Sequence, residues 1–150
     1  AGAGLSVALS TDLKIAAPKV KFVSGFCQIG LAPDAGLSHL LVKNLGYSKS
    51  LEFAVLGASL LSEEMFEYNM INSISENPLE EALKWANQVN QMPPLSLRMV
   101  KRNLQFAEDH SMEDVLDLEK ATQRFLGFTE DYNEGVRAFF EKRPPQFKGQ

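Results

Sequence analysis

The hydrophobic pattern of the chain changes near residue 77, and this change limits the possible folds more than any other feature. From Asn77-Pro78 onward, apolar residues recur at the three- and four-residue spacing of amphipathic helices, in one stretch after another. Asparagine caps a helix well and proline fits its first turn, so this pair suits a helix start. The pattern predicts an α/β region at residues 1–76 and an all-helical region at residues 77–150.

The helices expected after residue 77 have recognisable starts. Ser111 and Asp114 have the spacing of a capping box, with aspartate in place of the usual glutamate. Thr129 is a typical cap for the last helix. The helix after Pro94 is expected to face inward with Leu97, Val100 and Leu104. The last helix carries the apolar side chains of Tyr132, Val136, Phe139 and Phe140.

The first region alternates between two periodicities. Short polar and apolar alternation is typical of half-buried strands, whereas three- and four-residue spacing favours helices. An irregular, mostly apolar loop is expected at residues 25–33, and Gly46 and Gly57 are expected to end helices. Strands are expected at residues 12–17, 20–23 and 70–74, and helices at residues 4–9, 36–45, 48–56 and from Ser62 onward.

Composition excludes several classes of protein. With 45% hydrophobic and 23% charged residues, the 150-residue chain is expected to fold as a globular protein with a sizeable core. A net charge of −4 and a pI near 5.2 argue against a nucleic-acid partner. The charge-free stretch at residues 1–11 is far shorter than the roughly 20 apolar residues of a membrane span, so no membrane partner is expected.

The single cysteine and the first residues bear on location and completeness. Cys27 alone excludes an internal disulfide framework, and a reducing, cytoplasmic location is the simpler interpretation. A secretory signal requires a basic segment before its apolar run, and no such segment precedes the first apolar run of this chain. The chain opens without methionine on small residues that normally follow an earlier element. We therefore expect it to lack the front of a longer protein.

Most of the chemically active side chains have simpler explanations. His39 and His110 lie far apart and have no paired ligand spacing, so no metal site is expected. Ser38 and His39 are helical neighbours that point apart, which excludes a triad. Cys27 is interpreted as a small buried hydrophobe. Three cations share one helix face and favour solvated charge over a phosphate site: Arg98, Lys101 and Arg102.

Two features remain open from the residues alone. Gly2 and Gly4 flank Ala3 at the start of a helix, which suits either an oxyanion or phosphate site or a plain helix start. Asp34 lies between an apolar loop and a glycine. In that setting a carboxylate either loses water and becomes a stronger base, or caps the following helix.

Residues 1–17 resemble the second conserved block of the crotonase (enoyl-CoA hydratase/isomerase) superfamily, and further segments agree in order over the whole chain. The other matching segments are residues 21–22, 29–36, 46–49 and 134–147. Pro33-Asp34 and residues 131–136 are most similar to the ring-1,2-epoxyphenylacetyl-CoA isomerase branch. The resemblance implies an α/β fold: the C-terminal part of a crotonase (ClpP/crotonase-like) ββα spiral, followed by a helical oligomerisation region.

The resemblance also implies roles for individual residues. Family members hold a thioester carbonyl with two backbone N–H groups, and the second of these corresponds to Ala3, while the first lies outside the chain. Hydratases of the family use two glutamates, and the matching positions are Ser6 and Phe26. Asp34 matches the single acidic residue of the isomerases. The implied activity is a one-base double-bond shift in an enoyl-CoA, with hydration and epoxide rearrangement of an aromatic CoA ester as alternatives.

Partners follow from the same resemblance. The substrate is an acyl-CoA thioester, coenzyme A enters as part of that substrate, and no separate cofactor is expected. The helices after residue 77 are expected to form a homotrimer or hexamer, with Phe147 and Lys148 near the nucleotide end of CoA in a neighbouring subunit. By itself the chain is expected to be inactive. A competing hypothesis is a catalytically silent crotonase-fold fragment that only oligomerises or holds an acyl-CoA.

Overall fold

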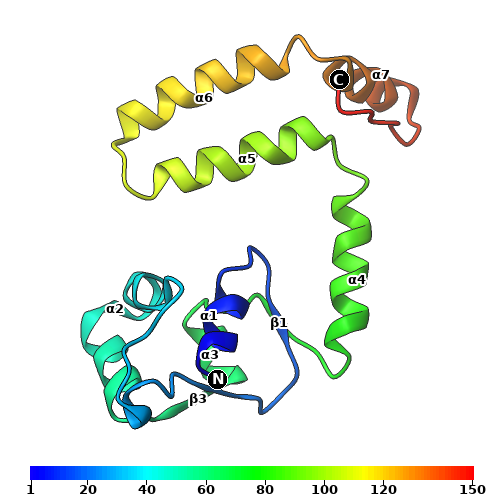
Figure 1. Cartoon of the computed structure of the whole chain (residues 1–150). Helices are drawn as coiled ribbons and strands as arrows, with labels where there is room; N and C mark the ends of the chain where they lie inside the picture. Colours follow the sequence, from blue (N-terminus) through cyan, green and yellow to red (C-terminus); the bar gives the residue numbers. More distant parts are fainter. The chain divides into compact units, whose positions relative to one another are not determined.

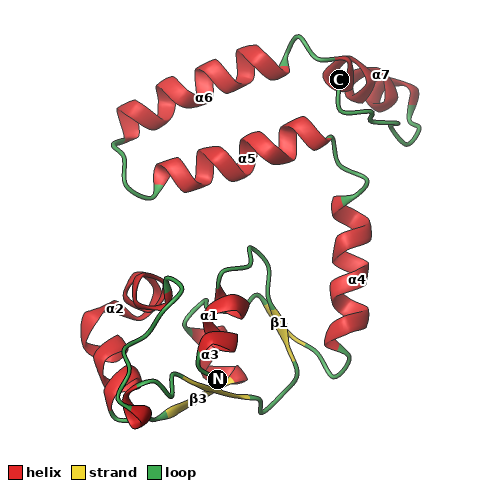
Figure 2. Cartoon of the chain, in the orientation of Figure 1, coloured by secondary structure: helices red, strands yellow, loops and turns green.

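The computed structural model describes residues 1–150, which are mostly helical with four short strands (Figures 1 and 2). The chain divides into two compact units, Ala1–Lys84 and Trp85–Gln150. This division falls inside helix α4, Pro78–Val89, whereas the sequence pattern changes where that helix begins. None of the helices combines the length and apolar character needed to cross a membrane.

The first unit contains all the strands. Two expected strands, at residues 12–17 and 70–74, are much shorter in the structure because only Ile15–Ala16 and Ser73–Ile74 pair, and the strand β3 (Ser59–Leu61) was not predicted. A 3-10 turn, η1, lies inside the apolar loop expected to be irregular. The elements before α4 are α1 (Ala3–Leu9), β1 (Ile15–Ala16), β2 (Lys21–Val23), η1 (Cys27–Ile29), α2 (Leu37–Val55), β3 (Ser59–Leu61), α3 (Ser62–Glu67) and β4 (Ser73–Ile74).

The strands form two separate two-stranded sheets. β1 pairs with β4 in parallel, with Ile15 opposite Ser73. β2 pairs with β3 in antiparallel register, with Phe22 opposite Leu60. The partners in the parallel pair are far apart in sequence, so their pairing depends on the packing of the helices between them.

The hydrophobic core lies in the first unit and joins α1 to α2. Leu5 and Leu9 of α1 are buried in the same cluster as Leu37 and Leu41 of α2. The other buried members of this cluster are Phe26, Phe53, Leu60, Met65, Met70 and Ile71. Burying side chains of this size contributes about 1.5–3 kcal/mol each. This packing fixes α1 beside the segment that leads into α2.

Helix α2 is interrupted at Gly46, as the sequence predicts. Gly46 has φ 72° and ψ 167°, which no helix interior adopts, so two helical stretches meet there at a kink. Glycine reaches this left-handed φ without the steric cost that a Cβ would add. Ser50 stabilises the kink, because its hydroxyl donates to the Gly46 carbonyl at 2.6 Å.

The second unit consists of helices and an extended C-terminal segment. Its start signals are confirmed: the Ser111 hydroxyl accepts from the Asp114 N–H, the Asp114 carboxylate accepts from the Ser111 N–H, and the Thr129 hydroxyl accepts from the Tyr132 N–H. α5 and α6 run antiparallel side by side (Figure 1). The helices of this unit after α4 are α5 (Pro94–Ala107), α6 (Met112–Leu126) and α7 (Glu130–Glu141).

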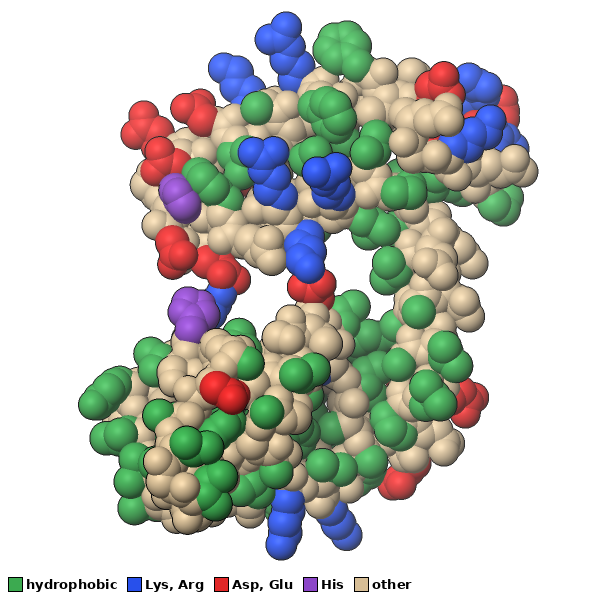
Figure 3. Space-filling model, in the orientation of Figure 1, with side chains coloured by type: hydrophobic (Ala, Val, Ile, Leu, Met, Phe, Trp, Pro, Cys, Tyr) green, Lys and Arg blue, Asp and Glu red, His purple; other side chains and the backbone are tan.

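The apolar stripes of the helices after residue 77 are largely exposed, so the inward-facing expectation for α5 is wrong in this chain. Leu97 is half-buried, but Val100 is 55% exposed and Leu104 is 66% exposed. Among hydrophobic residues of the second unit only Ala138 is buried. The physical reason is that α5 and α6 cover one face of each other and leave the remaining apolar faces open. Hydrophobic side chains are visible on the surface among charged ones (Figure 3).

Candidate functional site

The N-terminal end of α1 presents an unpaired backbone donor. Gly2 takes a left-handed φ of 52°, and its N–H donates to the Val23 carbonyl at 3.1 Å, which ties the start of α1 to the end of β2. The N–H of Ala3, the first helical residue, has no hydrogen-bond partner. Helix starts leave such groups open, and their partial positive charge favours a negatively charged oxygen.

Asp34 lies in the segment between η1 and α2, and its carboxylate points toward α1. The hydroxyl of Ser6, which is fully buried, donates to Asp34 Oδ1 at 3.4 Å. Asp34 itself is exposed to solvent in the 150-residue chain. The expectation of a desolvated carboxylate is therefore wrong here, because the apolar loop at residues 25–33 runs beside Asp34 without covering it.

The structure also corrects the alternative in which Asp34 caps a helix. The residue at the cap position of α2 is Gly36, with φ 83°, and no side chain caps this helix. Only the backbone of Asp34 takes part, since its carbonyl accepts from the Leu37 N–H at 2.9 Å. Ala35, at φ 47°, and Gly36 are both left-handed, so the chain turns before the helix begins. This turn leaves the carboxylate free of a capping role.

α1 links the open donor to the carboxylate. Ala3 and Ser6 are three residues apart on this helix, which is about 4.5 Å along its axis and places them on neighbouring positions of one side. Through Ser6, Asp34 is thus held within about one helical turn of the Ala3 end. The sequence gives no signal for this contact, which joins segments 28 residues apart.

The other position matched to a hydratase glutamate belongs to the core. Phe26 is buried in the hydrophobic cluster that joins α1 and α2. Its aromatic ring carries no group that moves a proton at ordinary pH. Three positions were matched to acidic residues of the family: Ser6, Phe26 and Asp34. Among them, only Asp34 carries a carboxylate, and it lies beside α1.

The remaining candidate residues are the cysteine, the two histidines and the three cations of α5. No group of three or more histidine, cysteine or acidic residues is arranged to hold a metal ion. Cys27 is exposed, so its interpretation as a buried hydrophobe is wrong; it begins η1, which turns it outward. His39 is exposed, and His110 stacks on Phe106 with ring centroids 3.5 Å apart. The three cations of α5 are all exposed: Arg98, Lys101 and Arg102.

Phe147 and Lys148 lie on the C-terminal segment, which is bound to α7. Asp131, only 4% exposed, accepts the N–H groups of Lys148 at 2.7 Å and Gly149 at 2.8 Å. The ring of Phe147 packs against Gly135. Phe147 lines a mainly apolar groove of about 560 Å³, and Lys148 lines a hollow of about 840 Å³ beside α7.

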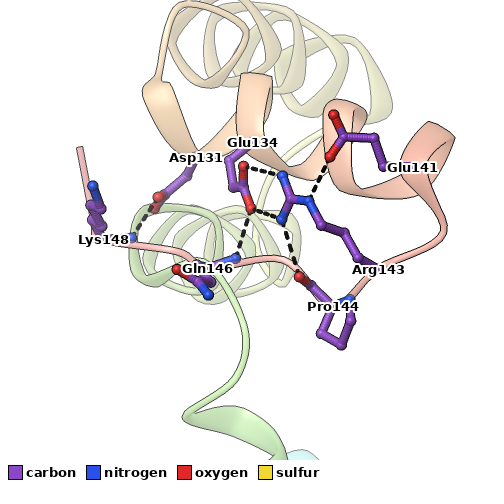
Figure 4. A network of polar contacts seen from close by, with 7 residues as sticks. All are labelled: Asp131, Glu134, Glu141, Arg143, Pro144, Gln146 and Lys148. Carbon is purple, nitrogen blue, oxygen red and sulfur yellow. Dashed lines mark hydrogen bonds and ion pairs between the residues drawn. The ribbon is translucent and has the colours of Figure 1, made fainter.

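An ion-pair network fixes the same segment (Figure 4). Arg143 donates from Nη1 and Nη2 to the two carboxylate oxygens of Glu134, at 2.6 and 2.9 Å, and from Nε to Glu141 at 2.6 Å. Glu134 also accepts the Gln146 N–H at 2.9 Å. The bonds from Arg143 and then from Gln146 lower the pKa of Glu134 from 4.5 to about 2. The bonds to Glu134 and then to Glu141 raise the pKa of Arg143.

We expect docking of the C-terminal segment to weaken in acid. Docking of the segment lowers the pKa of Glu134. The ionised Glu134 therefore stabilises the docked segment fully above about pH 4.5, and this stabilisation is lost as the pH falls through about 2. Hydrogen-exchange protection of the Gln146 amide should follow this course, and Glu134→Gln should remove most of it at neutral pH. Glu141→Gln, which leaves the Gln146 bond intact, is the matched control. Equal protection in Glu134→Gln and the unaltered chain would contradict this account.

Comparisons with known proteins bear on both units. Residues 1–150 match the family described as Enoyl-CoA hydratase/isomerase. The 1,2-epoxyphenylacetyl-CoA isomerase of Escherichia coli (strain K12) is 38% identical over 99% of this chain and 58% of its own length. Trans-2-decenoyl-(acyl-carrier-protein) isomerase of Streptococcus mutans is 32% identical over 99% of this chain and 57% of its own length.

The structural comparison gives the same picture. The crystal structure of an enoyl-CoA hydratase from Polaromonas sp. JS666 is similar with a TM-score of 0.92 and 29% identity, over 98% of this chain and 58% of that one. The chain therefore spans less than two thirds of the length of these proteins. Isomerases and hydratases both occur among them.

Proposed function

The chain belongs to the enoyl-CoA hydratase/isomerase family, and from that premise we propose that it supplies the base and one oxyanion donor of an acyl-CoA isomerase. The observation that supports this most is the Asp34 carboxylate, joined by Ser6 to the helix whose first N–H, that of Ala3, is open. A carboxylate held beside a short helix, and an anion-stabilising donor at the start of that helix, are the two groups that enolate chemistry needs.

The proposed reaction is a one-base proton shift. The Ala3 N–H, together with a second donor from outside these 150 residues, binds the thioester oxygen of a 3-enoyl-CoA. Asp34 takes the proton from the carbon alpha to the carbonyl, the electron pair passes into a dienolate, and the donors hold its oxygen. The same carboxyl group then returns the proton to the gamma carbon and leaves the conjugated 2-enoyl-CoA. Each donor of this type contributes about 10²–10³-fold in rate.

Isomerisation is preferred to hydration because only one acid serves the site. Adding water across a double bond calls for a group that activates water and a group that protonates carbon. Ser6 and Phe26, at the positions that correspond to the hydratase glutamates, supply neither. A single carboxylate that gives back the proton it removes is sufficient for a double-bond shift.

We expect the whole protein to isomerise a 3-enoyl-CoA to its 2-enoyl isomer and to hydrate 2-enoyl-CoA poorly, at least about 100-fold more slowly. The reason is the missing second carboxylate, since one general acid or base typically contributes 10²–10⁴-fold. Absorbance of the conjugated thioester follows isomerisation, and a coupled dehydrogenase assay follows hydration. Hydration at a rate comparable with isomerisation would contradict the one-base mechanism.

Two further assignments extend the proposal. Epoxide rearrangement of an aromatic CoA ester is a second candidate, supported by the 38% identity to 1,2-epoxyphenylacetyl-CoA isomerase. For the nucleotide end of CoA we propose Phe147 and Lys148, because the C-terminal segment holds an aromatic ring and a cation at adjacent positions. Coenzyme A is then part of the substrate, and no separate cofactor is needed.

A homotrimer or hexamer is the proposed assembly. Its support is the exposure of large apolar side chains on every helix from α4 to α7, since isolated chains seldom leave such surfaces open to water. The competing hypothesis of a silent oligomerisation or acyl-CoA-holding fragment shares this assembly but assigns no role to Asp34. Substitution of Asp34 therefore separates the two hypotheses.

A further inference from the structure

We propose that Ser6 is a positioning residue that holds the Asp34 carboxylate toward the start of α1. This inference rests on the proposed function, in which Asp34 is the base. The hydroxyl of Ser6 donates to Asp34 Oδ1 at 3.4 Å, and the serine side chain is fully buried while the aspartate is exposed. A buried donor is thus hydrogen-bonded to an exposed acid.

The orientation of Ser6 differs from that of the other hydroxyl residues near it. Serine and threonine in or next to a helix commonly bond back to a carbonyl of the preceding turn. Ser10 donates to the Val7 carbonyl and Thr11 to the Ala8 carbonyl, both at 2.8 Å. Ser6 instead makes its hydrogen bond outside the helix, to a residue 28 positions away. Local helix chemistry therefore does not account for its direction.

The segment that carries Asp34 leaves its carboxylate dependent on Ser6. Ala35 and Gly36 are left-handed at φ 47° and 83°, and for alanine this conformation is strained. The turn fixes the Asp34 backbone through the bond from the Leu37 N–H to the Asp34 carbonyl. The Asp34 carboxylate, however, does not cap helix α2. The Ser6 hydroxyl is the hydrogen-bond partner that sets the direction of this side chain.

Helix α1 therefore positions both the proposed base, Asp34, and the proposed oxyanion donor, the Ala3 N–H. Ser6 and Ala3 are part of one helix, and its start is tied to β2 through the bond from Gly2 N–H to Val23 carbonyl. A movement of the base by about 1 Å can cost about 100-fold in rate. Loss of the Ser6 hydroxyl should therefore slow proton transfer while leaving the binding of acyl-CoA nearly unchanged.

The test compares side chains of equal shape with and without a hydroxyl in the whole protein. Ser6→Ala and Ser6→Val remove the donor, whereas Ser6→Thr has the shape of valine and keeps it. We expect kcat for 3-enoyl-CoA isomerisation to fall at least about tenfold in the alanine and valine variants, with KM within about twofold, and threonine to restore most of it. The control is Ser10→Ala, because the Ser10 hydroxyl donates to a carbonyl of its own helix. We expect this variant to keep the kcat and KM of the unaltered protein.

A second measurement covers variants that fold poorly. Exchange of the substrate alpha proton with solvent deuterium reports proton removal directly, and thermal unfolding identifies unstable variants. If the Ser6→Val and Ser6→Thr variants both unfold, the rate of alpha-proton exchange in Ser6→Ala decides whether Ser6 has the proposed role. Unchanged kcat and exchange in Ser6→Ala, or equal activity of valine and threonine variants, would overturn the role of Ser6. Retained turnover in Asp34→Asn would instead overturn the proposed function itself.

Discussion

Replacing Asp34 with asparagine should abolish isomerisation in the whole protein, with a loss of about 10²–10⁴-fold in kcat. The amide keeps the size of the carboxylate, and its oxygen can still accept the hydrogen bond from Ser6. The turn before α2 keeps its backbone bond from the Leu37 N–H to the carbonyl of residue 34. What the amide loses is the ability to take a proton. The dissociation constant of a non-reacting acyl-CoA should stay within a fewfold, as measured by titration calorimetry.

The structure makes this substitution easier to interpret than the sequence did. Asparagine caps helices about as well as aspartate, so a capping role would also predict a stable protein. Gly36 occupies the cap position instead, and loss of activity therefore reports chemistry rather than folding. Asp117→Asn makes the same chemical change at an exposed position of α6 and should leave turnover unaltered. An Asp34→Asn enzyme that turns over normally would show that the base lies elsewhere.

Local features of the fold could be predicted because their causes lie within a few residues. The capping box of Ser111 and Asp114 and the break at Gly46 depend on side chains or backbone angles of neighbouring positions, and both are confirmed. The family and the α/β fold of a crotonase C-terminal part are also confirmed, by the whole-chain family match and by structural similarity. These came from resemblance, which carries information that periodicity lacks.

Features that depend on packing could not be predicted. The bond between Ser6 and Asp34 joins α1 to a segment 28 residues away and exists only because α1 and α2 share a core. Periodicity marks the apolar side of α5 but not what covers it, so Val100 was expected to face inward and is exposed. Cys27 was misplaced for a related reason, since the 3-10 turn that exposes it has no clear sequence signal.

By itself, the 150-residue chain is expected to form multimers or aggregates rather than a stable monomer. Phe139 and Phe140 of α7 are 79% and 77% exposed, and Leu79 of α4 and Leu104 of α5 are 73% and 66% exposed. Extended apolar surface and short, unpaired strand edges commonly drive association. Light scattering on the purified chain measures the mass directly, and a stable monomer at micromolar concentration would contradict this expectation.

The same sample should show no isomerase turnover, for a separate reason. Asp34 is exposed to water in the 150-residue chain. Ala3 provides the one oxyanion donor that we assign to this chain. Water at both groups competes for the enolate and for the proton, and the absence of one donor alone costs about 10²–10³-fold. Turnover close to that of the whole protein, followed by absorbance of the conjugated thioester, would refute this part.

A charged substitution separates specific association from general stickiness. Phe139 and Phe140 are in edge-to-face contact, with ring centroids 5.7 Å apart, and both line the groove beside the C-terminal segment. If this aromatic pair is part of the associating surface, Phe139→Asp together with Phe140→Asp should lower the mass seen by light scattering. Val7→Asp on α1, also an exposed apolar position, is the control. Because all three side chains are exposed, none of these changes removes core packing, so a change in mass reports the surface alone.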